Sequence, residues 1–186
     1  MLQFIITDNT IVVNNVKRGF RNLMAELKLP STIKMVITDF DGVVTDNCVY
    51  ISDNGEMSRK LNFKDIMGFS ILKKSGYEIG IISGEKNHAI DILSKKFDIK
   101  EVHTNIRKKF DVLKEIVEKY SYSQEEYLYI GDDINDLESL MFAKYRITVP
   151  HAPEVLKNLD GIQITSCDGG LGAFREVADC LAGLKK

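Results

Sequence analysis

Three short polar segments of the sequence are rich in acidic residues, and each follows a run of apolar residues. They are the segments 39–45, 83–86 and 131–136. Ligands of an open α/β sheet bind at the edge where the parallel strands end, so residues that directly follow the strands lie close together there. We therefore expect the carboxylates of these segments to converge on one edge of a sheet.

Converging carboxylates predict a bound divalent cation, because like charges held close together need a cation to neutralise them. A set of hard oxygen ligands without His or Cys suits Mg²⁺. We expect the side chains of Asp39 and Asp132 and the backbone carbonyl of Asp41 to bind this ion. The remaining octahedral positions are then open to water and to a phosphate oxygen.

The same residues could hydrolyse a phosphate ester. Asp39 is placed to act as the nucleophile, and Asp41 could protonate the leaving oxygen and later deprotonate the attacking water. Ser83 offers a hydroxyl beside the backbone N–H groups that open the next helix, which suits a phosphate group. A lysine adds positive charge, and the residue types alone leave Lys108 and Lys109 as alternatives.

Each of these signals has a plainer explanation when taken singly. A pair of aspartates two residues apart occurs by chance in acidic loops, and a Ser after a strand is ordinarily a helix cap. The alternative is thus a set of acidic loops in an unrelated α/β fold. The joint placement of the signals on one predicted edge favours the phosphate site.

The elements that must position these residues are visible as an alternation of short β-branched runs and helix-period segments from residue 35 onward. This order predicts an α/β fold with a doubly wound parallel sheet. Strands buried on both faces are almost continuously apolar, and those expected here are 35–38, 78–82, 101–103, 127–130, 145–149 and 162–164. The expected helices are 65–75, 86–97, 108–120, 135–142 and 172–184.

Two further segments interrupt this alternation. The pair Asn54-Gly55 stands between the short extended runs 49–51 and 57–63, and such a pair is typical of a β-hairpin. At the N-terminus, the apolar run 4–13 and the helix-like run 16–29 predict either an extra strand and helix or a linker. We divide the chain into an N-terminal extension, residues 1–33, and one domain, residues 34–186.

The composition excludes several classes of protein. Lys and Arg number 25 against 27 Asp and Glu, a formal net charge of −2, so a nucleic-acid partner is not expected. Three widely spaced cysteines without a CxxC pair argue against a disulfide framework and favour the cytoplasm. No stretch approaches the roughly 18 apolar residues of a membrane helix, and the start of the chain lacks the features of a signal peptide.

The three histidines have no Cys or His partner at metal-ligand spacing. His88 stands on a polar-rich helical segment, where a lone histidine is more often a surface or capping residue. His103 and His151 stand near the ends of expected strands. We therefore expect all three histidines to lie outside the functional site.

Four motifs of the chain resemble, in order, those of haloacid dehalogenase-like phosphatases. They are DFDGVVTD, which begins at Asp39, IISG, which ends at Gly84, the lysine at position 109, and GDDINDLE, which begins at Gly131. The resemblance covers residue 35 to the C-terminus. It implies a Rossmann-like fold, Asp39 as nucleophile, Asp41 as acid and base, Ser83 and Lys109 as phosphate ligands, and Asp132 as a metal ligand.

A narrower resemblance concerns the substrate. The short cap, the segment NGEMSRKLNFKD and the tail GGLGAFREV resemble the branch that dephosphorylates 3-deoxy-octulosonate 8-phosphate and its nine-carbon relatives in lipopolysaccharide or sialic acid biosynthesis. This implies no large cap domain and a homotetramer in which hairpins and tails close neighbouring sites. Asp133 and Asp136 would support the metal ligands. The residues expected to bind the substrate are Ser83, Gly84, Glu85, Lys86, Asn62, Lys64 and Arg175.

Two positions depart from the octulosonate phosphatases, which usually carry Arg at both. Glu85 follows the motif glycine, and Lys64 precedes Asp65. A Glu accepts hydrogen bonds from sugar hydroxyls, whereas an Arg pairs with a carboxylate, and loss of a bidentate fork is not a conservative change. These exchanges favour a nine-carbon sugar acid phosphate.

Three other functions compete with this interpretation. The substrate could be another small phosphosugar, or the domain could be a catalytically weak oligomerisation module linked to CMP-sugar synthesis. A receiver domain phosphorylated on Asp shares an acidic pocket and Mg²⁺. Its pattern does not predict two aspartates after the first core strand together with an acidic run after a late strand, which favours the phosphatase.

Overall fold

The computed structural model describes residues 6–7, 10–11 and 26–184. Its core is a six-stranded sheet in the order β10-β9-β8-β3-β6-β7, in which every neighbouring pair is parallel. The strands are β3 (Met35–Thr38), β6 (Glu78–Ile82), β7 (Glu101–His103), β8 (Tyr127–Ile130), β9 (Tyr145–Thr148) and β10 (Gln163–Ile164). The chain runs from β3 to one edge and then from β8 to the other. The predicted doubly wound α/β sheet is confirmed.

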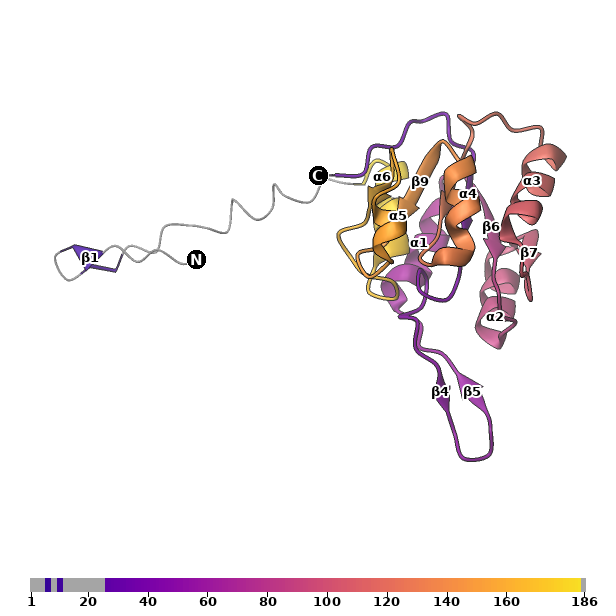
Figure 1. Cartoon of the computed structure of the whole chain (residues 1–186), viewed down its shortest axis with the longest axis horizontal. Helices are drawn as coiled ribbons and strands as arrows, with labels where there is room; N and C mark the ends of the chain where they lie inside the picture. The colour runs from indigo at the N-terminus through magenta and orange to yellow at the C-terminus, as the bar shows by residue number, and fades with distance from the viewer. Residues whose placement is uncertain (1–5, 8–9, 12–25, 185–186) are drawn as a thin grey trace.

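Helices cover both faces of the sheet (Figure 1). One buried apolar cluster joins the sheet to α1 (Phe63–Lys74), α2 (His88–Phe97) and α6 (Ala173–Leu181). The opposite cluster joins it to α3 (Lys109–Lys119), α4 (Leu137–Phe142) and α5 (Glu154–Lys157). Successive residues of a strand point to opposite faces, so Val36 enters the first cluster and its neighbours Met35 and Ile37 enter the second.

Several predicted boundaries are wrong, and side-chain caps explain two of them. The second hairpin strand ends at Ser58 instead of residue 63, because Asn62 accepts a hydrogen bond from the Lys64 amide and begins α1 at Phe63. Asn87 likewise accepts a bond from the Ile90 amide, so α2 begins at His88. A serine, threonine, aspartate or asparagine at this position satisfies an amide that the helix leaves unpaired.

Other elements also differ from the prediction. The expected helix 135–142 is divided into the 3₁₀ helix η3 (Ile134–Asp136) and α4. The sequence pattern did not predict α5. Near the N-terminus, β1 (Ile6–Thr7) and β2 (Thr10–Ile11) form an antiparallel pair. Most of the expected helix 16–29 lies outside the described residues, and residues 26–29 are not helical.

The predicted hairpin consists of β4 (Tyr50–Ile51) and β5 (Met57–Ser58), which pair antiparallel. It projects from the end of the sheet at which the parallel strands finish (Figure 1). Between β3 and α1 the chain inserts only this hairpin, so no large cap domain stands there. The hairpin is therefore the only structured insertion between these two elements.

The described part of the chain contains no membrane-spanning helix and no disulfide bond. Within it, no helix is long and apolar enough to cross a membrane. No disulfide bond joins Cys48, Cys167 and Cys180, all of which lie between residues 26 and 184. Cys48 is exposed, whereas Cys167 and Cys180 are half-buried.

Candidate active site

The polar segments meet at one edge of the sheet, as the pattern predicts. Thr38, the last residue of β3, lies opposite Ile81 of β6 and Ile130 of β8. The residues that follow these strands, including Asp39 and Asp132, therefore leave the sheet side by side. The backbone amide of Asp39 donates a hydrogen bond to the Ile130 carbonyl at 2.8 Å and holds this loop to the next strand.

Three buried carboxylates form the centre of this edge. One oxygen each of Asp39, Asp132 and Asp136 lies within 4.8 Å of the others. The ammonium group of Lys109 lies 2.9 Å from Asp39 Oδ2 and 2.9 Å from Asp136 Oδ1, with its side chain fully buried. Lys108 is exposed at the start of α3. The structure thus brings Lys109, and not Lys108, to the carboxylates.

Asp136 is fully engaged by the protein itself. Its Oδ1 accepts hydrogen bonds from Lys109 Nζ and from the Tyr129 hydroxyl at 2.7 Å. Its Oδ2 accepts from the backbone amides of Asp132 and Asp133 at 3.2 Å and 3.4 Å. Burial and the Asp136 carboxylate raise the pKa of Tyr129 well above its usual value, which keeps its phenol as a donor. Asp136 therefore fixes the loop after β8 and leaves Asp39 and Asp132 free to bind a cation.

The electrostatics of this cluster favour a cation. Burial raises the pKa of Asp39 well above its usual value, and the Asp136 carboxylate adds to this effect, while Lys109 opposes it. Burial and Asp136 also raise the pKa of Asp132. Burial alone would lower the pKa of Lys109, but the carboxylates of Asp136 and Asp39 raise it. Three carboxylates around one ammonium group leave excess negative charge, so the residues fit a hard divalent ion.

Asp41 lies beside this cluster with one oxygen held and one available. Its Oδ1 accepts hydrogen bonds from Arg59 Nε at 2.8 Å and from the Thr45 hydroxyl at 3.1 Å. Its Oδ2 is buried and has no hydrogen-bond partner among the described residues. A buried carboxylate oxygen without a partner is costly, and here it is available for a proton or a ligand hydroxyl.

Close backbone packing holds the loop that carries Asp39 and Asp41. A Cβ atom at Gly42, whose φ is +92°, would lie 1.9 Å from Asp132 Oδ2. A Cβ atom at Gly169 would lie 1.8 Å from the Gly42 carbonyl oxygen, and the Gly170 amide donates to the Val43 carbonyl at 3.1 Å. Only glycine permits such approaches. The C-terminal tail segment, residues 166–172, therefore packs directly on the catalytic loop, residues 39–46.

The loop after β6 carries four of the residues that we expect to contact phosphate and substrate. Ser83 is buried, and its hydroxyl oxygen accepts a hydrogen bond from the Glu85 amide at 3.2 Å. Gly84 lies next to the loop after β8, because a Cβ atom there would approach Asn135 Nδ2 at 3.8 Å. Glu85 and Lys86 are exposed at the entrance to α2.

The remaining residues that we expect to bind the substrate line two separate cavities. A cavity of about 490 Å³ is lined by Lys86 and Arg59 together with apolar side chains of the hairpin and α2, and Arg59 connects it to Asp41. A separate cavity of about 290 Å³ is lined by Lys64 and Arg175 and by none of the three central carboxylates. Arg175 Nε donates to Asp179 at 2.6 Å. The structure does not bring Lys64 and Arg175 to the acidic cluster within one chain.

Asn62 and Asp133 have local partners. The Asn62 side chain, besides its cap on α1, donates to the Gly170 carbonyl at 3.0 Å and so links α1 to the tail segment. Asp133 is exposed, and its side chain caps η3 by accepting from the Ile134 amide at 2.7 Å. Both residues therefore shape the loops around the cluster.

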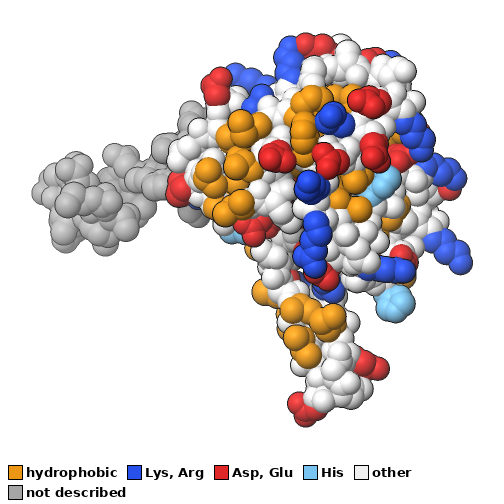
Figure 2. All heavy atoms as spheres, turned by 45° about the vertical axis from the view of Figure 1, so that its right-hand side comes forward, with side chains coloured by type: hydrophobic (Ala, Val, Ile, Leu, Met, Phe, Trp, Pro, Cys, Tyr) orange, Lys and Arg blue, Asp and Glu red, His pale blue; other side chains and the backbone are white. Residues whose placement is uncertain are grey.

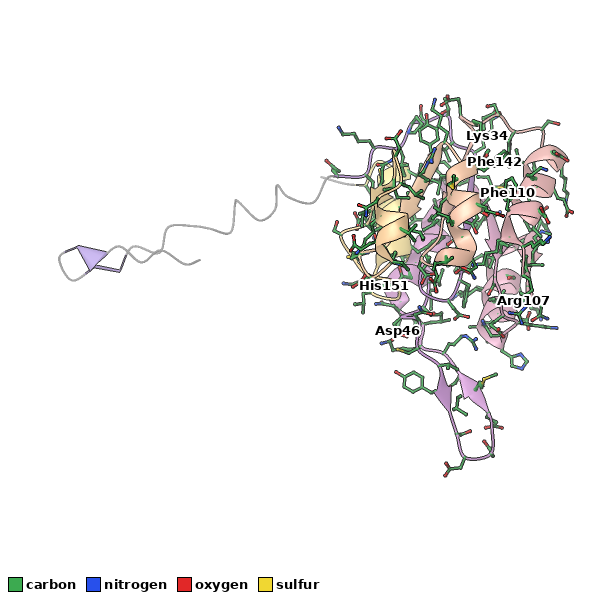
Figure 3. All side chains as sticks on the ribbon, in the orientation of Figure 1. Lys34, Asp46, Arg107, Phe110, Phe142 and His151 are labelled. Carbon is green, nitrogen blue, oxygen red and sulfur yellow. The ribbon has the colours of Figure 1, made fainter. Side chains whose placement is uncertain are left out.

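His151 corrects the expectation that every histidine lies outside the site. Its Nε2 lies 3.3 Å from Asp132 Oδ2, and its Nδ1 lies 3.0 Å from Asp168 Oδ1. Figure 3 places His151 with Asp46 at the end of the body from which the hairpin projects. Sequence spacing missed it because both partners are distant along the chain. His103 instead contacts Glu101. His88 is exposed and lines the cavity of about 490 Å³ together with Arg59 and Lys86.

Comparison with known proteins identifies relatives of this arrangement. The model of the haloacid dehalogenase-like hydrolase family matches residues 49–172. The 3-deoxy-D-manno-octulosonate 8-phosphate phosphatase of Haemophilus influenzae is 30% identical over 149 residues, which are 80% of this chain and 82% of the relative. The alignment thus extends over most of both proteins.

Two solved structures, each with a bound metal ion, have a fold similar to that of this chain. The phosphatase of the same name from Moraxella catarrhalis, in complex with magnesium, phosphate and KDO, is 28% identical with a TM-score of 0.78, and the match covers 83% of this chain and 88% of that chain. The cobalt-bound form of the Haemophilus influenzae phosphatase is 29% identical with a TM-score of 0.75, covering 82% and 89%.

Proposed function

Since the chain belongs to the haloacid dehalogenase-like hydrolases and is a phosphatase, we propose that it hydrolyses a 2-keto-3-deoxy sugar acid phosphate of eight or nine carbons with Mg²⁺ as cofactor. The observation that carries this proposal is the buried cluster of Asp39, Asp132 and Lys109 beside the unpartnered oxygen of Asp41. These groups would supply a nucleophile, a cation site and a proton carrier at one edge of the sheet.

The proposed reaction has two steps. An Asp39 carboxylate oxygen attacks phosphorus, the bond from phosphorus to the sugar oxygen breaks, and Asp41 in its acid form gives its proton to that oxygen. Water then attacks the phosphorus of the phospho-aspartate while Asp41 takes a proton from the water. The bond from phosphorus to Asp39 breaks, which releases phosphate and restores the Asp39 carboxylate.

The surrounding residues favour both steps. Lys109 holds Asp39 and would also face the phosphate oxygens, and the Ser83 hydroxyl would donate to them. Side-chain oxygens of Asp39 and Asp132 and the Asp41 carbonyl would hold Mg²⁺, which draws charge off the phosphoryl group. Arg59 keeps Asp41 Oδ1 occupied, so Oδ2 is the oxygen that exchanges the proton.

The substrate class is supported by the relatives and by the cavity next to Asp41. Two named relatives are phosphatases of 3-deoxy-D-manno-octulosonate 8-phosphate. The cavity of about 490 Å³ offers the cationic side chains of Arg59 and Lys86 beside apolar walls, which suits a sugar acid. Glu85, exposed directly before Lys86 in the chain, could accept hydrogen bonds from sugar hydroxyls and favours the nine-carbon acids.

We also propose that the chain assembles as a homotetramer through the hairpin. Figure 2 shows apolar side chains on this projection, and Val49, Tyr50, Ile51 and Met57 are 46%, 56%, 65% and 62% exposed. Contiguous exposed apolar groups usually mark an interaction site. Assembly would also explain how Lys64 and Arg175, remote from the acidic cluster of their own chain, could serve the site of a neighbour.

The decisive experiment measures phosphate release with Mg²⁺ from octulosonate 8-phosphate, nononate 9-phosphate, N-acetylneuraminate 9-phosphate and simple phosphosugars. We expect selective turnover of one sugar acid, loss of turnover in Asp39→Asn, and full turnover in Asp160→Asn, whose side chain is exposed in the turn between α5 and β10. Replacement of Mg²⁺ by Co²⁺ tests the choice of metal. A folded, assembled protein inert toward all substrates would instead favour the oligomerisation module.

A further inference from the structure

We propose that His151 and Asp168 are positioning residues that orient Asp132 for metal binding and thereby couple metal affinity to the packing of the tail segment. This inference rests on the proposed metal-dependent phosphatase. Neither residue is one of the three carboxylates at the centre of the site. Their effect would therefore pass through Asp132.

The first part of the argument is the way His151 is held. His151 lies in the loop between β9 and α5. Asp168 Oδ1 accepts a hydrogen bond from the His151 backbone amide at 2.9 Å and lies 3.0 Å from its ring Nδ1. One carboxylate oxygen thus fixes both the backbone and the ring of this residue. The ring then has a single orientation, in which Nε2 faces Asp132 Oδ2.

The second part concerns the two oxygens of Asp132. Oδ2 is contacted by His151 Nε2 at 3.3 Å and by the Asn47 amide nitrogen at 3.4 Å. These groups come from two different loops, one after β9 and one after β3. With Oδ2 held from both sides and packed against Gly42, the carboxylate would offer Oδ1 to a bound cation. Partners of this kind fix the rotamer of a metal ligand and so raise metal affinity.

The third part is the position of Asp168 in the chain. It directly precedes Gly169 and Gly170, which pack against the backbone of Gly42 and Asp46. The same short segment therefore supports the loop that carries Asp39 and, through His151, the carboxylate of Asp132. A displacement of the tail segment would move both metal ligands, and bound metal would in turn hold the tail segment in place.

The test measures metal binding directly, without substrate, on the full chain. Mg²⁺ affinity is determined by calorimetry and Mn²⁺ affinity by electron paramagnetic resonance for wild type, His151→Ala, His151→Gln and Asp168→Asn. We expect His151→Ala to weaken binding about 10-fold to 100-fold and Asp168→Asn to weaken it less. His151→Gln, whose amide nitrogen can replace Nε2, should restore most of the affinity. His88→Ala, at an exposed histidine, is the control.

The outcomes separate this inference from the proposed function. If wild type binds metal and His151→Ala binds it equally well, the inference is overturned while the phosphatase proposal stands. If wild type binds no metal, the proposed function fails first. Thermal unfolding in chelator checks that the variants fold, as expected for a partly exposed side chain. At saturating metal, kcat of His151→Ala should recover with KM unchanged, and a lasting loss of kcat would contradict a role in positioning alone.

Discussion

The hairpin and the tail segment both reach the catalytic loop from outside the sheet, yet they do so by opposite means. The tail segment is packed: Gly169 and Gly170 contact the loop backbone, and Asp65 of α1 accepts hydrogen bonds from the Gly172 and Arg175 amides at 3.0 Å and 3.1 Å. The hairpin is exposed along both strands. Its base contacts the loop through ion pairs of Arg59 with Asp41 and of Lys60 with Asp46.

This difference shows which part of the site is complete within one chain. Gly169 and Gly170 of the tail segment leave no room for a side chain against the catalytic loop, as a close-packed support requires. The apolar side chains Tyr50, Ile51 and Met57 of the hairpin stay more than half exposed within the chain, and the proposed assembly would bury them. Substitutions in the two regions should therefore have opposite signatures.

The largest expected effect is that of Gly169→Ala. The new methyl group would lie 1.8 Å from a backbone oxygen of the catalytic loop, so the free energy of unfolding should fall by about 3 kcal/mol or more, with most activity lost. In the hairpin, Gly55→Ala meets no atom within 4 Å and strains only a φ of +83°, which costs about 1 kcal/mol. Urea unfolding compares them, and equal losses would contradict the comparison.

Arg59→Gln should give the next largest effect, and on activity instead of stability. The variant removes a charge-assisted hydrogen bond to Asp41, worth about 2 kcal/mol, so kcat should fall about 30-fold. Lys60→Gln removes the neighbouring, more exposed pair with Asp46 and should change kcat by less than about 3-fold. Steady-state kinetics with one sugar acid phosphate measures both, and equal losses would show that the hairpin base acts only through its charge.

A smaller effect, on the pH dependence of stability, is expected from Asp65→Asn, because Asp65 holds the end of the tail segment. Burial raises the pKa of Asp65, although backbone amides oppose the shift. A carboxyl group with a higher pKa in the folded state stabilises fully below its unfolded pKa of about 4 and loses that contribution as the pH rises through the folded value. The urea midpoint of Asp65→Asn should therefore rise relative to wild type between pH 4 and pH 7. A constant difference would contradict the predicted shift.

The smallest effect on stability is expected from Ile51→Ser with Met57→Ser. Both side chains are more than half exposed, so the free energy of unfolding of the single chain should change by less than about 0.5 kcal/mol. Sedimentation velocity should nevertheless show a shift from tetramer to smaller species. Glu56→Ser, a polar change on the same hairpin, should leave the assembly intact. An unchanged tetramer in the double variant would place the interface elsewhere.

The parallel strands and the acidic edge could be predicted because their signals are local. The strands β3, β6, β7 and β8 have the predicted bounds, since buried strands are continuous apolar runs. The helix α5 has only four residues, too few for a helical period, and was missed. This helix is held by the burial of Leu156 in the second apolar cluster, and the sequence alone does not show which residues form that cluster.

The sequence did not identify some residues of the site, because their positions depend on contacts between segments that are distant along the chain. Lys108 and Lys109 have the same chemistry, and only the turn at the start of α3 decides that the second one points inward. His151 has partners 17 and 19 residues away, a spacing that matches no metal motif. Arg59 was assigned to a strand that ends one residue earlier.

The central strand β3 has a consequence for the timescale on which Asp39, the proposed nucleophile, can move. All four of its residues are buried, and it is paired on both sides, with β6 and with β8. Backbone amides in such a strand exchange their hydrogens with solvent only when the whole domain unfolds, whereas amides of a two-stranded projection exchange through local opening. Asp39, anchored at the end of β3, therefore keeps its place for as long as the protein stays folded, while the hairpin can open and close many times.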